Sequence, residues 1–279
     1  NGTAPGILVE QDGKIMIMLP GPPNELIPMF ENEVAPELAK RSGQTFVSIV
    51  LRLCGIGESA AEARIKDLID AQTNPTIAPY AKTFEVHFRL TASGATREEA
   101  LALIEPLKVE LYNRFGQDIY AEGSQTLDAT ICKLLADKGL TLATAESCTG
   151  GLLASRIVDN PGSSAVFIDG TITYSNEAKI ARLGVKPETL EKFGAVSSET
   201  AIEMAEGAVR TSGADVGLSV TGIAGPSGGT DEKPVGRVYI GVCICGKSSA
   251  IELNLKGDRA KIRARAAAIA LDFLRRELL

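Results

Sequence analysis

The sequence predicts an α/β protein in which a small α+β unit precedes a larger three-layer domain, with a mixed sheet between two layers of helices. Three observations support this prediction. The 279 residues are 44% hydrophobic, enough for sizeable cores. In the second half, short apolar runs typical of buried strands alternate with segments of helical periodicity. The runs 235–244 and 249–255 flank Gly246 and Lys247, which predicts an antiparallel hairpin at the sheet edge.

Residues 1–45 form the first segment. An alternating stretch ends at Leu19, and a Pro-Gly-Pro-Pro turn precedes a predicted helix over 24–40. This segment is too small to hold a core by itself. Because Asn1 is not an initiator methionine and no signal peptide follows it, we expect the remnant of a domain whose upstream part is missing.

Residues 46–121 are predicted to form the α+β unit. The strands are expected at 46–53 and 84–92, with one helix over 58–70 and a second that begins after Thr96 and ends at Gly116. The unit contains more Asp and Glu than Lys and Arg, which disfavours binding to a phosphate backbone. We place the domain boundary at 121–124.

Residues 122–279 are predicted to form the larger domain, whose helices and strands alternate. Ser198 is the expected cap of one of its helices. The expected helices are 127–138, 151–158, 177–183, 187–193, 198–210 and one from 258, and the strands before the hairpin are 140–145, 165–174 (with a possible break at Gly170) and 216–220.

Composition excludes several classes of protein. The net charge of −6 and the lack of a basic block disfavour a nucleic-acid partner, and no apolar run is long enough to span a membrane. Five scattered cysteines do not form a disulfide framework and fit a reducing cytoplasm. The single histidine, His87, lies in a strand pattern, so the second half cannot contain a Ser-His-Asp triad or a histidine-ligated zinc site.

The loop 145–151, Ala-Glu-Ser-Cys-Thr-Gly-Gly, joins a strand to a helix start. Unpaired N–H groups at such a turn can form an oxyanion hole or hold a phosphate, and Ser147 would be exposed to a ligand. An ordinary capping loop explains the same pattern equally well. Cys148 is the rival nucleophile, although a reactive thiol normally has a basic partner.

Two further polar loops follow strands. In 173–179, Thr-Tyr-Ser-Asn-Glu-Ala-Lys, a desolvated Lys179 could act as the base that a serine needs, and Tyr174 could relay the proton; a solvated surface lysine is the commoner case. In 219–230, closely spaced glycines permit a ligand to approach the backbone, although a flexible surface loop fits equally well. Ligands bind beyond strand ends in open α/β sheets, so the three loops are candidates for one site.

Together, the motifs at 145–151, 173–179 and 220–229, followed by Lys-Pro-Val-Gly at 233–236, resemble the CinA C-terminal domain family, which contains the nicotinamide-nucleotide amidohydrolases also called PncC. Residues 1–6 and 19–25 resemble the end of the molybdopterin-binding-like domain of full-length CinA, and 46–120 resemble its KH-like domain. The loop at 55–57, Gly-Ile-Gly, is not the GXXG loop of RNA-binding KH domains.

The resemblance implies hydrolysis of nicotinamide mononucleotide to nicotinate mononucleotide and ammonia, without a cofactor in this domain. Ser147 would be the nucleophile, with Lys179 and Tyr174 handling the proton. It also implies a homodimer that takes a pyridine nucleotide as its substrate. The expected substrate-binding residues are Thr149, Gly150, Thr221, Gly222, Gly225, Lys233 and Arg259.

Two other functions remain open at this point. The family's first domain is linked to ADP-ribose pyrophosphatase activity with a divalent cation, which would need the missing strands. A non-enzymatic, competence-related binding role predicts tight binding without turnover.

Overall fold

The computed structural model describes residues 4–82 and 84–279. Two compact units divide the chain. The first comprises the described residues up to Ile49 together with 65–78 and 89–114, and the second comprises 50–64, 79–88 and 115–279. No helix among the described residues is long and apolar enough to cross a membrane.

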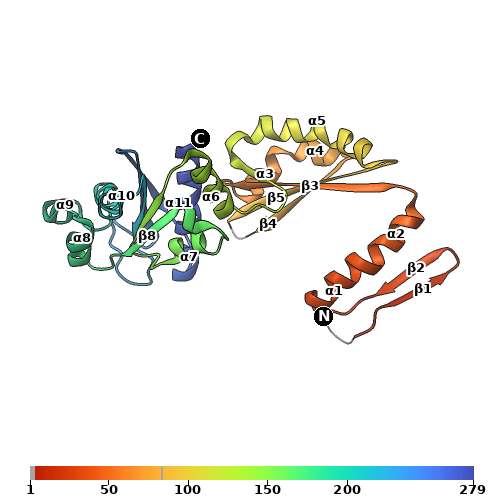
Figure 1. The fold of residues 1–279 in the computed structure, drawn as a ribbon, viewed down its shortest axis with the longest axis horizontal. Helices are drawn as coiled ribbons and strands as arrows, with labels where there is room; N and C mark the ends of the chain where they lie inside the picture. The colour runs from red at the N-terminus through yellow and green to blue at the C-terminus, as the bar shows by residue number, and fades with distance from the viewer. Residues whose placement is uncertain (1–3, 83) are drawn as a thin grey trace. The chain divides into compact units, whose positions relative to one another are not determined.

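A hairpin and a long helical stretch begin the first unit (Figure 1). Strands β1 (Ile7–Gln11) and β2 (Lys14–Met18) pair in antiparallel fashion around Asp12 and Gly13, whose φ angles of 51° and 72° are those of a tight hairpin turn. The helix predicted over 24–40 extends from 23 to 42, as α1 (Pro23–Met29), a π-helical turn (Phe30–Val34) and α2 (Ala35–Ser42). Pro28 lies just before the π-helical turn, at a position where its missing N–H favours such an irregularity.

The strands of a four-stranded sheet, ordered β4-β5-β3-β6, contribute residues to both units. The single helix predicted over 58–70 is wrong, because Ile65 leaves the helical conformation and separates two short helices. The strand at 76–82 was not among those expected from the sequence, and its Pro79 is tolerated because β4 is an edge strand. The elements of this region are β3 (Thr45–Cys54), α3 (Glu58–Arg64), α4 (Lys66–Ala71), β4 (Thr76–Lys82), β5 (Glu85–Gly94), α5 (Arg97–Phe115) and β6 (Ile119–Glu122).

A five-stranded sheet, ordered β11-β10-β9-β7-β8, lies at the centre of the second unit. Strand β7 is parallel to both β8 and β9, whereas β10 is antiparallel to β9 and β11, so the sheet is mixed as predicted. Its elements are α6 (Leu127–Lys138), β7 (Leu142–Glu146), α7 (Leu152–Val158), β8 (Phe167–Ile172), α8 (Asn176–Leu183), α9 (Pro187–Phe193), α10 (Ser198–Ser212), β9 (Val216–Gly222), β10 (Arg237–Ile244), β11 (Lys247–Asn254) and α11 (Arg259–Leu278).

Helices cover both faces of this sheet (Figure 1). Because successive side chains of a strand point to opposite faces, Leu142 joins the core formed with α6, α7 and α11, whereas Ala143 and Ala145 join the core formed with α8, α9 and α10. The three-layer α/β class predicted from the sequence is therefore confirmed.

Two local predictions need correction. The cap of α10 is Ser197 and not Ser198, since the Ser197 hydroxyl accepts a hydrogen bond from the N–H of Thr200 at 3.2 Å. Strand β8 is also continuous through Gly170. A Cβ atom there would lie 3.2 Å from both Phe167 and Thr144, so this glycine permits close packing and does not break the strand.

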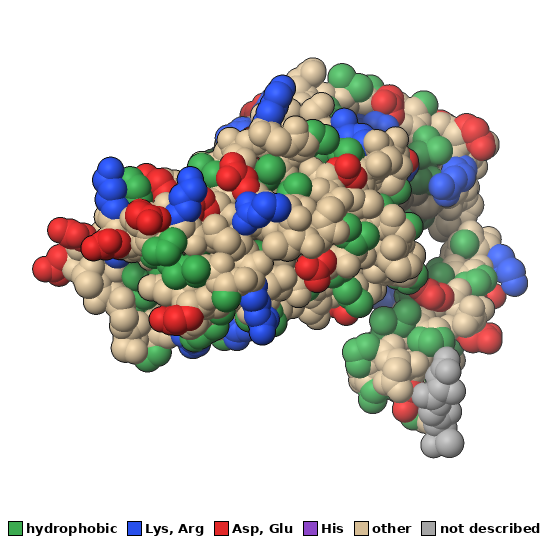
Figure 2. Space-filling view, turned by 60° about the vertical axis from the view of Figure 1, so that its left-hand side comes forward, with side chains coloured by type: hydrophobic (Ala, Val, Ile, Leu, Met, Phe, Trp, Pro, Cys, Tyr) green, Lys and Arg blue, Asp and Glu red, His purple; other side chains and the backbone are tan. Residues whose placement is uncertain are grey.

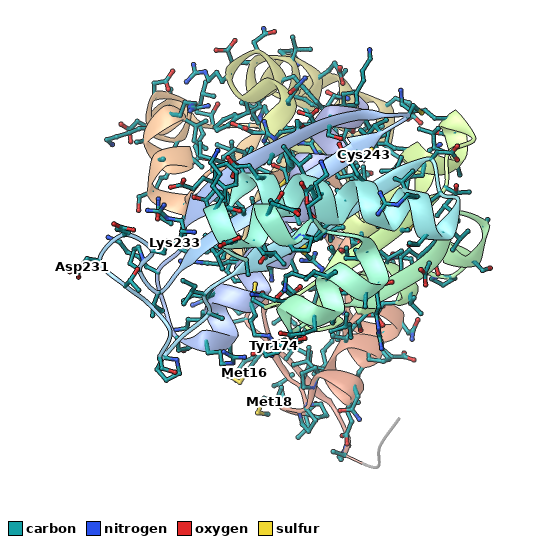
Figure 3. All side chains as sticks on the ribbon, turned by 90° about the vertical axis from the view of Figure 1, so that its left-hand side faces the viewer. Met16, Met18, Tyr174, Asp231, Lys233 and Cys243 are labelled. Carbon is teal, nitrogen blue, oxygen red and sulfur yellow. The ribbon has the colours of Figure 1, made fainter. Side chains whose placement is uncertain are left out.

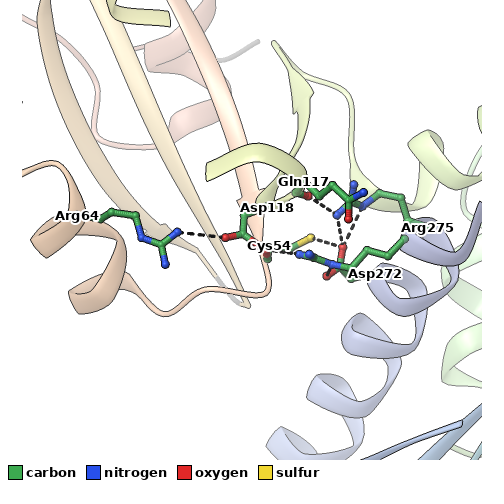
Figure 4. A network of polar contacts seen from close by, with 7 residues as sticks. Cys54, Arg64, Gln117, Asp118, Asp272 and Arg275 are labelled. Atoms are coloured by element: carbon green, nitrogen blue, oxygen red, sulfur yellow. Dashed lines mark hydrogen bonds and ion pairs between the residues drawn. The ribbon is translucent and has the colours of Figure 1, made fainter. Parts of the chain in front are cut away.

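A buried polar network surrounds Asp272 on α11 (Figure 4). Its carboxylate accepts hydrogen bonds from the Cys54 thiol at 2.9 Å, Arg275 Nη2 at 2.7 Å and Arg276 Nε at 2.8 Å. Burial acts to raise the pKa of Asp272, but the Cys54 hydrogen bond and the two arginines together hold that pKa below its ordinary value. Asp272 is 7% exposed and Arg275 only 2%. Because little water reaches them, the two opposite charges stabilise each other.

Replacing Asp272 by alanine is expected to destabilise the protein by about 3 kcal/mol or more, because the buried Arg275 guanidinium loses its counter-ion. Thermal unfolding followed by circular dichroism measures the effect. The matched control is Lys133→Ala, which removes an exposed ion pair with Asp137 and is expected to change stability by less than about 1 kcal/mol. Equal melting temperatures for the two variants would contradict the role assigned to Asp272.

Candidate active site

The three candidate loops follow three adjacent strands, β7, β8 and β9. Since these strands are parallel to one another, their carboxyl ends lie at the same edge of the sheet. Backbone hydrogen bonds hold the loop starts together: the Ser147 N–H donates to the carbonyl of Val220 at 2.9 Å, and the Thr173 N–H donates to that of Glu146 at 2.8 Å. The topology thus places the first loop between the end of β9 and the second loop.

Ser147 and Lys179 are brought together by this arrangement. Helix α8 is capped by the Ser175 hydroxyl and carries Lys179 in its first turn. The Lys179 Nζ lies 3.1 Å from Ser147 Oγ and 2.8 Å from the carbonyl oxygen of Thr173, to which it donates. The first of these distances is within the range for direct proton transfer between a nucleophile and its base.

Burial changes the chemistry of Lys179. This residue is only 1% exposed, and the loss of solvation lowers the pKa of its amine. Within residues 4–82 and 84–279, no carboxylate forms an ion pair with it. A neutral amine that donates to the Thr173 carbonyl still has a lone pair that can accept the Ser147 proton. The pair therefore has the geometry and the electrostatics of a nucleophile and a general base.

Glu146 fixes the turn that carries Ser147, a role that the sequence did not reveal. Its carboxylate is 1% exposed and accepts hydrogen bonds from the N–H groups of Gly151 at 2.9 Å, Leu153 at 3.0 Å and Ala154 at 2.8 Å. It thereby satisfies N–H groups at the start of α7, where no local capping residue is present. An acidic residue at the end of a buried strand was the signal that could have indicated this role.

Backbone donors remain in the same turn. The N–H groups of Thr149 and Gly150 find no acceptor within the part of the chain that the structure describes. Gly150 and Gly151 have φ angles of 61° and 91°, in the left-handed region that favours glycine, so the turn requires these residue types. Free N–H groups beside a nucleophile are what an oxyanion hole needs.

Thr221 and Gly222, two of the expected substrate-binding residues, have structural contacts. The Thr221 hydroxyl donates to the carbonyl of Ala195 at 2.7 Å. A Cβ on Gly222 would lie 2.6 Å from the side chain of Val238, so this glycine allows β9 and β10 to pack closely. Both residues stay near Ser147 through the pairing of β9 with β7.

Helix α11 contributes two arginines to the loops. Arg263, which the sequence did not single out, donates to the carbonyl of Cys148 at 3.0 Å and to that of Thr149 at 2.6 Å. Arg259 donates to the carbonyl of Gly225 at 2.8 Å and to the Tyr174 hydroxyl at 3.2 Å. Tyr174 is 65% exposed, and among the described residues its hydroxyl has no hydrogen bond to Ser147 or Lys179. The structure therefore pairs Tyr174 with Arg259 and not with the lysine.

Lys233 lies on the long loop between β9 and β10, together with Asp231 (Figure 3). Its amine donates to the carbonyl of Phe193 at the end of α9, at 2.5 Å. Gly225 on the same loop has a φ angle of 75° and lies against Val235. Lys233, like Arg259, is thus held by a hydrogen bond to a backbone carbonyl.

Cys148 is a poor nucleophile in this environment. The side chain is buried, and burial raises the pKa of its thiol to about 11. Few molecules would carry the reactive thiolate near neutral pH. The electrostatics therefore favour Ser147 over Cys148.

Charged side chains of both signs are interspersed on the face of the molecule shown in Figure 2. Nucleic-acid-binding surfaces usually concentrate Lys and Arg on one face. This distribution agrees with the net charge of −6.

Comparisons with known proteins identify relatives of both folded regions of the chain. Residues 124–278 match the CinA C-terminal domain, and residues 48–121 match the KH domain of the damage-inducible protein CinA. Relatives include a CinA-like protein of Kosmotoga olearia, which is 55% identical over 278 residues, and a competence-damage inducible protein of Clostridium acetobutylicum, which is 54% identical over 279 residues. Each alignment covers 100% of this chain and 68% of the relative.

Solved structures of the same superfamily resemble this chain over about half its length. The competence/damage inducible protein of Agrobacterium tumefaciens aligns with a TM-score of 0.53 and 44% identity, covering 54% of this chain and 92% of that one. A CinA superfamily protein of Escherichia coli aligns with a TM-score of 0.51 and 33% identity, covering 57% and 96% respectively. The chain belongs to the CinA family.

Proposed function

We propose that the domain formed by residues 122–279 hydrolyses the carboxamide of nicotinamide mononucleotide to nicotinate mononucleotide and ammonia. The observation that supports this function best is the 3.1 Å contact between Ser147 Oγ and the buried amine of Lys179. Such a pair can attack an amide without a histidine. The choice of the pyridine nucleotide rests on the resemblance of the three loops to the nicotinamide-nucleotide amidohydrolases.

In the first half of the reaction, Lys179 takes the proton of Ser147 as its oxygen attacks the carboxamide carbon. The carbonyl oxygen becomes an oxyanion, which the free N–H groups of Thr149 and Gly150 stabilise, each donor contributing about 3 kcal/mol. The C–N bond then breaks, and Lys179 returns the proton to the leaving nitrogen. Ammonia departs and an acyl ester remains on Ser147.

In the second half, a water molecule attacks the ester carbon and Lys179 takes its proton. The bond to Ser147 Oγ breaks, and Lys179 returns a proton to this oxygen, so that nicotinate mononucleotide leaves and the enzyme is regenerated. We place the ribose phosphate near Arg259 and Tyr174, because the guanidinium supplies charge-assisted donors for phosphate oxygens.

Ammonia release from a panel of substrates tests this function. The panel contains nicotinamide mononucleotide, nicotinamide riboside, free nicotinamide and ADP-ribose, each with and without a chelator. We expect ammonia from the mononucleotide, at a rate that the chelator does not change and well above the rate for free nicotinamide. Absence of ammonia from every amide would refute the proposal. Metal-dependent cleavage of ADP-ribose alone would favour a pyrophosphatase, and binding without turnover would favour a non-enzymatic role.

A further inference from the structure

A cleft is present in the second unit, and neither Ser147 nor Lys179 is among the residues that line it. Its volume is about 700 Å³, within the usual range of about 300–1,000 Å³ for small-molecule sites. Three parts of the chain line it: 55–58 before and at the start of α3, 81–82 and 84–86 at the end of β4 and the start of β5, and 254–256 at the end of β11 and after it together with 261, 265 and 269 of α11. All of these lining residues belong to the same compact unit.

Positive charge predominates in this cleft, although the whole chain has a net charge of −6. The cationic lining residues are Lys82, Lys256, Lys261 and Arg265, and the carboxylates are Glu58 and Glu85. Four cations minus two carboxylates give +2. Glu85 already accepts hydrogen bonds from the Tyr120 hydroxyl at 2.7 Å and is 2.9 Å from the ring nitrogen of His87, so its charge is partly engaged.

Two of the lysines are available for a ligand. Within the described residues, Lys82 and Lys256 form no ion pair. Lys261 lies 3.8 Å from the exposed carboxylate of Asp258, a distance at which the two charges attract only weakly. Amines left unpaired in a concave site attract anions, because the low-dielectric walls concentrate their field.

Arg265 is held in place at one wall. Its guanidinium donates to the carbonyl of Lys256 at 2.9 Å and lies 5.4 Å from the centre of the Phe84 ring. The apolar residues Ile56, Val86 and Ile269 complete the lining. The cleft therefore combines a positioned cation, exposed lysines and apolar surface, as expected of a site for an organic anion.

Helix α11 separates this cleft from the candidate active site. Arg259 and Arg263 are four residues apart and share one side of the helix, from which they contact the active-site loops. Lys261 and Arg265 are displaced from them by two residues, or about 200° around the helix axis. Basic residues on one side of this helix thus contact the active-site loops, and those on the opposite side line the cleft.

We propose that this cleft binds an organic anion of nucleotide size that carries two or more phosphate groups. A single phosphate would neutralise the excess charge but would fill only a small part of the volume. A nucleoside diphosphate would place its phosphates among Lys82, Lys256 and Lys261 and its ring against the guanidinium of Arg265 and the apolar wall.

Isothermal titration of the whole chain with ADP and with inorganic pyrophosphate tests the proposal. We expect both probes to bind, ADP more tightly, and the Lys82→Ala/Lys256→Ala double variant to weaken binding by at least about tenfold. Both lysines are exposed, so the variant is expected to fold. The matched control is Lys133→Ala/Lys138→Ala on α6, which removes two exposed lysines elsewhere and is expected to leave affinity unchanged.

Arg259→Ala distinguishes the cleft from the active site. This variant is expected to bind ADP as the unmodified chain does, whether or not the proposed amidase reaction is correct. Failure of both probes to bind at millimolar concentration would overturn the proposal. Equal weakening by the α6 control, or loss of binding in Arg259→Ala with retention in the cleft variant, would overturn it as well.

Discussion

Replacing Ser147 by alanine is expected to lower the rate of ammonia release from nicotinamide mononucleotide by about 10⁴-fold or more, since removal of a nucleophile leaves only binding and the oxyanion donors. The change deletes one oxygen from a side chain that is 8% exposed, so the fold should be retained. The hydrogen bond from the Ser147 N–H to Val220 belongs to the backbone and is unaffected. Steady-state ammonia production by purified protein measures the effect.

The control for this experiment is Cys148→Ala. Its thiol is buried with a pKa of about 11, and the interaction that holds the turn uses the carbonyl of residue 148, which alanine keeps. We expect this variant to retain activity within a few-fold. Loss of activity in Cys148→Ala together with near-normal activity in Ser147→Ala would transfer the nucleophile to the neighbouring thiol.

Replacing Lys179 by methionine is expected to lower the turnover rate by about 10²–10⁴-fold, the range that a positioned general base contributes. Methionine has a similar length and no charge, so it fills the buried site without requiring solvation. We therefore expect the melting temperature to be maintained or raised while activity is lost. A fall in both quantities would point to a structural role for the lysine.

The pH dependence of the reaction provides an independent check. Only the neutral amine can accept the Ser147 proton, so kcat/KM should fall as the pH drops through the pKa of Lys179. Burial lowers this pKa, which places the midpoint below the ordinary value of about 10.4 for lysine. The residual rate of Lys179→Met should lack this dependence, and an identical pH profile in the variant would assign the titration to another group.

Periodicity and capping residues predicted most of the second unit because they act locally. Thr126 caps α6 and Gly139 ends it. The hairpin between β10 and β11 was expected around Gly246 and Lys247 and turns one residue earlier, at Cys245 and Gly246. The secondary-structure predictions failed where tertiary contacts, and not the local sequence, determine the backbone conformation. Ile65 interrupts a stretch with good helical periodicity, and Pro79 fits a strand only because that strand lies at a sheet edge.

The candidate site could be predicted only in part for the same reason. Residue types in the loops indicated Ser147 and Lys179, but the burial that lowers the lysine pKa comes from packing that no local pattern describes. Tyr174 was expected to relay the proton between Ser147 and Lys179. Its hydroxyl instead accepts a hydrogen bond from Arg259, which lies 85 residues further along the chain. The roles of Glu146 and Arg263 were not predicted, because their contacts depend on how a strand end and a distant helix meet the same turn.

The hydrogen bonds from Arg263 to the carbonyl oxygens of Cys148 and Thr149 determine when the site can form during protein synthesis. Cys148 and Arg263 are 115 residues apart, so the turn around Ser147 leaves the ribosome well before α11 exists. A nascent chain can form the contacts between Glu146 and the start of α7 early, but the restraint that Arg263 places on the same turn is added only when α11 emerges and docks. The proposed active site is therefore complete only after the segment that carries Arg263 has been synthesised and has docked.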